Sequence, residues 1–141
     1  MTKPLFSIHT KAIEWLMALF MLGWAITLAM PGNTLSISAY VGFKKLGLTD
    51  NGLLTFYFTI SFIRILTLYG NGKLRKGPEI RFICSAVGAF TWLLTSALFF
   101  IPYAAGDVPQ LPVNVSHHVV MFFGELYAVG VAAVDRRTKL S

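Results

Sequence analysis

The sequence predicts an all-α integral membrane protein, a four-transmembrane-helix bundle with both termini in the cytoplasm. Three observations lead to this fold class. Among the 141 residues, 55% are hydrophobic and only 13% are charged, whereas a soluble domain carries roughly a quarter charged residues. Four stretches are apolar over a length that crosses a bilayer, and the basic residues gather on one predicted side of it. The composition therefore argues against both a soluble globular protein and a disordered chain.

A transmembrane helix needs about 20 mostly apolar residues, because each residue adds about 1.5 Å along the axis and the hydrocarbon core is about 30 Å thick. Within a single membrane domain, residues 1–141, the predicted spans cover about residues 12–30, 53–69, 80–101 and 115–134. Residues that end helices follow the first three spans, at Pro31-Gly32, Gly70-Asn71-Gly72 and Pro102. Residues that begin helices precede the second and third spans, at Thr49 to Asn51 and at Pro78-Glu79.

The first span is expected to be an uncleaved signal anchor. Lys3 and Lys11 precede it, as basic residues precede a signal peptide. However, its apolar run exceeds the roughly 7–15 residues of a signal-peptide core, and no A-x-A cleavage pattern follows Met30.

The segment between the first two spans, residues 35–48, is too short and too polar to cross the membrane. It predicts one of two structures. One is a short helix in the membrane interface, with apolar residues such as Phe43 facing lipid and with Lys44 and Lys45 reaching headgroups. The other is an irregular loop.

The distribution of the 12 Lys and Arg residues predicts the orientation. Nine fall on the side shared by the termini and the loop at residues 70–79, two fall on the opposite side, and Arg64 lies within a span. Because cytoplasmic loops are enriched in basic residues, this asymmetry places both termini in the cytoplasm. The basic residues are expected to contact anionic lipid headgroups rather than nucleic acid. Those predicted to contact headgroups are Lys73, Arg75, Lys76, Arg81, Arg136, Arg137 and Lys139.

Apart from Arg81 in the first turn of the third span, three charged residues fall within the spans: Glu14 in the first, Arg64 in the second and Glu125 in the fourth. A charge near the bilayer centre costs at least about 2.5–3.5 kcal/mol, so each needs a partner. We expect Arg64 to bridge Glu14, Glu125 or both in the bundle interior. Three interpretations remain open: a structural ion pair that fixes the helix register, a proton or ion pathway through Glu125, or contact with another subunit.

Small residues on the last two spans mark where helices can approach closely. The third span carries Ser85, Gly88 and Ala89, and the fourth carries Gly124, Ala128 and Ala132 at intervals of four residues. These stripes predict either packing of the third helix on the fourth or oligomerisation.

Neither a metal nor a cofactor is expected from the sequence. One cysteine, Cys84, cannot form a disulfide framework or a thiolate cluster within one chain. His9 lies near the inner end of the first span and His117 and His118 near the outer end of the fourth, so they cannot provide both axial ligands of one haem. Hydrogen bonding at the membrane interface is expected for these histidines, with pH sensing or an intersubunit metal as the alternatives. The sequence also contains no G-x-S-x-G, P-loop or H-E-x-x-H motif, and no enzymatic activity is expected.

A local pattern begins at Arg64 and continues through Tyr69-Gly70-Asn71-Gly72 and a basic stretch to Lys76. It ends with Gly77-Pro78-Glu79-Ile80-Arg81 opening a helix that contains Trp92. Residues 64–92 resemble a group of small multi-span membrane proteins encoded by bacteriophages and prophages, which has no agreed activity. The resemblance implies a phage or prophage origin and residence in the bacterial inner membrane, and it assigns no functional residue.

Two functions follow as expectations. The first is a non-enzymatic inner-membrane protein that acts by homo-oligomerisation or by binding a membrane partner, as a holin or a superinfection-exclusion or host-modulating protein would. The alternative is a small proton-coupled transporter or ion channel that uses Glu14, Arg64 and Glu125.

Overall fold

The computed structural model describes residues 4–70 and 76–140, with side chains described for residues 11–70 and 76–138. The described chain is all-helical. Its four long helices are α1 (Pro4–Ala29), α3 (Asp50–Tyr69), α4 (Gly77–Ala104) and α5 (Val115–Leu140). Each contains a segment long and apolar enough to cross a membrane, which confirms the prediction of four such helices.

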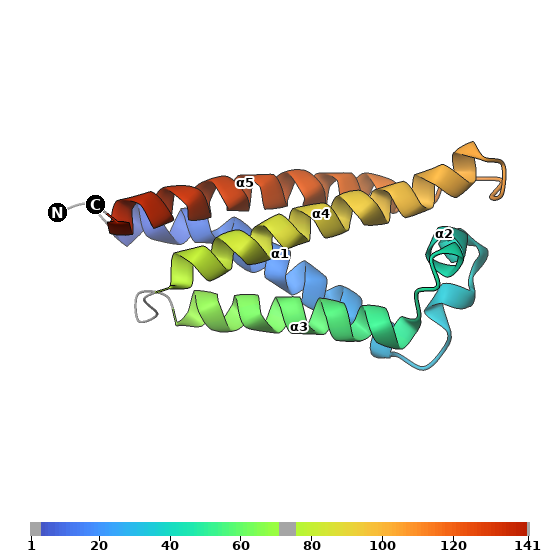
Figure 1. Cartoon of the computed structure of the whole chain (residues 1–141), viewed down its shortest axis with the longest axis horizontal. Helices are drawn as coiled ribbons and strands as arrows, with labels where there is room; N and C mark the ends of the chain where they lie inside the picture. The colour runs from blue at the N-terminus through green and yellow to red at the C-terminus, as the bar shows by residue number, and fades with distance from the viewer. Residues whose placement is uncertain (1–3, 71–75, 141) are drawn as a thin grey trace.

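The four helices form an elongated bundle (Figure 1). The start of α1 and the end of α5 lie at one end, and the α1–α3 and α4–α5 connections lie at the other. The closest packing is between α4 and α5 and between α1 and α3, and α1 also contacts α5. The contact between α3 and α4 is of the same, smaller extent as that between α1 and α5. The bundle is therefore two tightly packed helix pairs, α1–α3 and α4–α5, joined through the sparser α1–α5 and α3–α4 contacts.

The α1–α3 connection, for which the sequence predicted a short interfacial helix or an irregular loop, contains both helical and irregular segments. It consists of the 3-10 turns η1 (Thr34–Ser36) and η2 (Ser38–Tyr40) and the short helix α2 (Val41–Lys45). The expectation that Phe43 faces lipid was wrong: Phe43 is 1% exposed and packs in a cluster with Leu98 and Phe99 of α4. Close approach of the two helices is possible because Gly42 has no side chain, and a Cβ there would lie 2.1 Å from the Leu98 carbonyl oxygen.

Helix α4 continues past Pro102, which was predicted to end it, and ends at Ala104. A proline in the last turn removes one backbone N–H and is compatible with the helix already formed before it. The chain turns away from the helix at Gly106, which lies two residues beyond the helix end and has a φ of +78°. The Asp107 N–H then donates to the Pro102 carbonyl at 2.9 Å, as in a glycine-terminated helix.

Candidate functional site

A buried ion pair joins α3 to α5 in the bundle interior. Arg64 Nη1 donates to Glu125 Oε1 at 2.5 Å, and Arg64 Nη2 donates to the Ser85 hydroxyl of α4 at 3.1 Å. Both charged side chains are 0% exposed. The structure thus brings Arg64 and Glu125 together, whereas Glu14 pairs elsewhere.

A second buried cluster joins α1, α4 and α5 nearer the termini. Arg81 Nε donates to Glu14 Oε2 at 2.7 Å, and Arg81 Nη2 donates to the other oxygen of the same carboxylate. Arg81 Nη1 donates to Asp135 Oδ2 at 2.8 Å. A planar guanidinium suits this arrangement because its donors fan out toward two carboxylates at once.

The position of Arg81 corrects the prediction that it contacts lipid headgroups. Its side chain is 1% exposed and faces the bundle interior. Arg81, Ser85, Gly88 and Trp92 follow one another at intervals of four, three and four residues, so they share one face of α4, and all four are buried. This periodicity is the sequence signal that could have identified Arg81 as an interior residue.

The other basic residues predicted at headgroups are placed differently. Lys76, Arg136 and Arg137 are exposed at the end of the bundle that contains the start of α1. Lys73, Arg75 and the side chain of Lys139 lie outside the described residues.

Two of the small residues predicted to mediate helix packing, Gly88 and Gly124, lie against side chains of neighbouring helices. A Cβ on Gly88 would be 2.5 Å from Glu125 Oε1, and a Cβ on Gly124 would be 2.9 Å from the Met17 sulfur. Ser85, Ala89, Ala128 and Ala132 are also buried. These residues therefore serve helix packing within the chain.

His118 differs from the expected interfacial histidine. Its side chain is 2% exposed, and its Nδ1 has no hydrogen-bond partner in the described part of the chain. The ring stacks between Trp92 and Phe99, with centroid distances of 5.5 and 5.4 Å. It also contacts Trp24 edge-on at 5.1 Å. The sequence shows four aromatic positions but not that three helices bring them together.

An apolar groove lies between the loosely packed helices α3 and α4, closed at one end by α2. It has a volume of about 450 Å³. Small or hydroxyl-bearing residues, Gly52, Thr91 and Thr95, form part of its lining. Phe56 and Phe90 also line it and are 39% and 66% exposed, so the groove opens to the surface of the bundle.

The described residues contain no group of three or more His, Cys, Asp or Glu side chains that could hold a metal ion. The buried arginines Arg64 and Arg81 are engaged in ion pairs. Glu125 Oε2 is buried without a hydrogen bond from the described residues. No family model, curated protein or solved structure matches the chain.

Proposed function

We propose that the protein is a non-enzymatic component of the bacterial inner membrane that acts by self-association, with a helix of one copy binding the α3–α4 groove of the next. The groove is the observation that carries this proposal. Helices in a membrane associate through van der Waals packing against small residues, since lipid removes the hydrophobic driving force between them. Gly52, Thr91 and Thr95 provide such a surface.

The pairing of the two buried arginines favours self-association over transport. Arg64 and Arg81 each pair with a buried carboxylate of the same chain. Such pairs fix the register of helices. Because these arginines are already paired within the chain, we expect a contact with a second copy to use an apolar surface, and the α3–α4 groove is such a surface.

The occupant we propose is α3 of a second copy. Phe58 and Phe62 stack at a centroid distance of 5.8 Å and are each 49% exposed, so they form a ridge on α3. At about 100° per residue, this ridge faces away from Gly52, Phe56 and Tyr57, which line the groove. A ridge and a groove on opposite faces produce head-to-tail contacts, which form a ring where the rotation between copies closes. A closed ring of copies is the assembly that we propose for a holin-like activity.

Cysteine cross-linking between two differently labelled populations tests this contact. Phe58→Cys and Leu94→Cys would be made in a Cys84→Ala background and mixed in nanodiscs. Counted along α3 from Asp50 and along α4 from Ala104, the two positions lie at similar depths, about 12 and 15 Å from the helix ends. The expected result is a disulfide-linked dimer of the two populations.

Phe123→Cys on α5 is the matched control. It is also a half-exposed phenylalanine, 61% exposed, and lies about 12 Å from the start of its helix. It should not cross-link to Leu94→Cys. A monomeric mass by native mass spectrometry, with no cross-link above this control, would overturn the proposal.

A proton-coupled transporter is the second candidate, favoured by the unpaired oxygen of buried Glu125. Transport predicts that Glu125→Gln abolishes proton flux into liposomes while the protein remains folded. A structural role for the Arg64 pair predicts loss of folded protein instead. A phage origin, with a holin-like or superinfection-exclusion role, rests on the resemblance of residues 64–92 and is compatible with self-association.

A further inference from the structure

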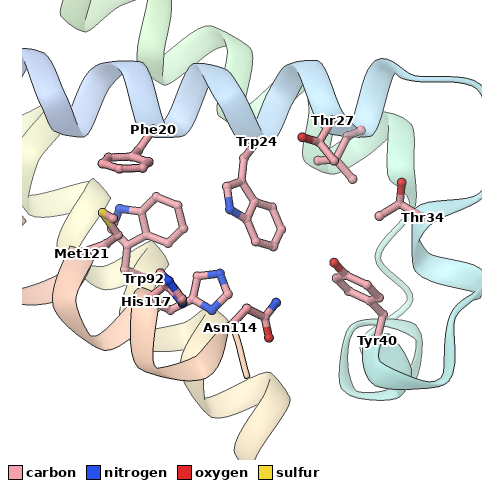
Figure 2. A pocket seen from close by; sticks show the side chains of 11 residues that line it. Phe20, Trp24, Thr27, Thr34, Tyr40, Trp92, Asn114, His117 and Met121 are labelled. Carbon is pink, nitrogen blue, oxygen red and sulfur yellow. The ribbon is translucent and has the colours of Figure 1, made fainter. Parts of the chain in front are cut away.

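A cavity of about 340 Å³ lies in the half of the bundle that contains the α1–α3 and α4–α5 connections, away from the chain termini (Figure 1). Figure 2 shows the cavity from close by. Its walls come from α1, the α1–α3 connection, α4 and the start of α5. Trp24 and Trp92 project into it from α1 and α4, with Tyr40 on a third side (Figure 2). The volume is at the lower end of the roughly 300–1,000 Å³ of small-molecule sites, so the cavity fits a single ring.

The lining is aromatic, and it includes buried polar atoms that lack partners. His118 Nδ1 and Asn114 Oδ1 are both buried without a hydrogen bond from the described residues. Such an atom costs about 1–3 kcal/mol unless a ligand or water satisfies it. His118 is held in place by its stack between Trp92 and Phe99, so its ring is presented in a fixed orientation.

The polar atoms indicate what the ligand must offer. The Asn114 amide oxygen only accepts hydrogen bonds, so the ligand needs a donor. A neutral imidazole offers one donor and one acceptor. No carboxylate lines the cavity, which disfavours an organic cation despite the aromatic walls. A ring hydroxyl both donates and accepts, and its flat ring packs against indole faces.

We propose that this cavity binds the hydroxyl-bearing ring of a membrane-soluble phenol. His118 and Asn114 contact the hydroxyl, and Trp24 and Trp92 contact the ring. Phe20 also lines the cavity and is 42% exposed, which gives access from the surface of α1. Two sources supply this chemistry: the quinol form of a membrane isoprenoid quinone, or a free phenol without a lipid tail.

Tryptophan fluorescence provides a local test. The chain has three tryptophans, and Trp24 and Trp92 both line the cavity. In a Trp15→Phe variant, all tryptophan emission therefore comes from the two residues that line the cavity. This protein in nanodiscs would be titrated with 4-nitrophenol, whose absorption overlaps tryptophan emission, at a pH that keeps its hydroxyl protonated. The expected result is saturable quenching.

Two variants and a control connect the quenching to the cavity. His118→Phe keeps a stacking ring and removes both nitrogens, and we expect affinity to fall about tenfold, the loss for one hydrogen bond. Thr27→Phe fills the cavity from an exposed position and should abolish saturation even if His118→Phe fails to fold. Ile26→Phe places the same phenyl ring at the preceding position, which is 52% exposed and outside the cavity lining, and this variant should bind normally.

Competition distinguishes the two sources. A short-chain quinol that displaces 4-nitrophenol at lower concentration than tail-less hydroquinone indicates the membrane quinol pool, and equal potency indicates a free phenol. Quenching that rises linearly with probe and is equal in all variants reflects partitioning into lipid alone. That outcome would overturn the proposed site and would leave self-association untouched, since the α3–α4 groove is separate.

Discussion

Replacing Gly88 with alanine is expected to break the Arg64–Glu125 ion pair although neither charged residue is substituted. A Cβ on Gly88 would lie 2.5 Å from Glu125 Oε1 and 2.7 Å from its Cδ. Carbon and oxygen atoms normally approach to roughly 3.5 Å, so the carboxylate must retreat by about 1 Å. A carboxylate on a free side chain would move at little cost, but this one is buried and bonded to Arg64 at 2.5 Å.

The geometry sets the magnitude. A retreat of about 1 Å would lengthen the Arg64–Glu125 contact beyond the roughly 3.2 Å limit of a good hydrogen bond, and Arg64 cannot follow freely because Ser85 holds its other nitrogen. Breaking a buried pair costs about 3–5 kcal/mol. Alanine recovers about 1 kcal/mol over glycine in a helix interior. The free energy of unfolding should therefore fall by about 2–4 kcal/mol.

Unfolding by SDS in mixed micelles, followed by tryptophan fluorescence, measures this change. Gly130→Ala is the matched control, because Gly130 is also helical and a Cβ there meets nothing within 4 Å. It should leave stability unchanged or raise it. Adding Glu125→Asp to Gly88→Ala shortens the crowded carboxylate side chain and should restore part of the loss. A Gly88→Ala protein as stable as Gly130→Ala would refute the reasoning.

Three further changes test other contacts. Arg81→Met should lower the free energy of unfolding by about 3–5 kcal/mol, because Glu14 stays buried without its guanidinium; adding Glu14→Gln should recover most of that loss in the same unfolding assay. Gly42→Ala should destabilise the α1–α3 connection by about 1–3 kcal/mol, because its Cβ would meet the Leu98 carbonyl at 2.1 Å; faster proteolysis of this connection is the readout. Burial raises the pKa of Tyr40 above its ordinary value of 10.0, so the folded state holds this proton more tightly than the unfolded state. The resulting stabilisation is present below pH 10.0 and lost as pH rises through the folded pKa, and unfolding measured across that range should be less alkali-sensitive in Tyr40→Phe.

The four long helices could be predicted because a bilayer demands a long apolar run for each crossing. Their ends could not be predicted as well. Hydropathy indicates where the apolar part of a helix ends, but the helical backbone can continue into a polar segment. Helix α5 does so, because it continues to Leu140 beyond the predicted span. Residues 35–48 were ambiguous because their structure depends on a tertiary contact, the approach of Gly42 to α4.

The charge pairing was predictable only in part. Composition and depth predicted that a buried arginine would meet a buried acid, as Arg64 and Glu125 do. They could not assign Glu14 to Arg81, since Arg81 lies in the first turns of α4, at the edge of the predicted span, where basic residues are expected to reach headgroups. Arg81 shares one face of α4 with the small residues Ser85 and Gly88, and this face is buried in the bundle. His118 was missed for a related reason, because its partners are distant in sequence.

The pairing pattern gives α5 a particular role in assembly. Glu125, which pairs with Arg64, and Asp135, which pairs with Arg81, both belong to this last helix. Before α5 packs, Arg64 has no carboxylate partner among the described residues and Arg81 has only Glu14. An unpaired arginine within a span costs at least about 2.5–3.5 kcal/mol. Helix α5 also contributes His118 to the aromatic cavity. The two buried ion-pair clusters and the cavity are therefore completed together, when the last helix joins the other three.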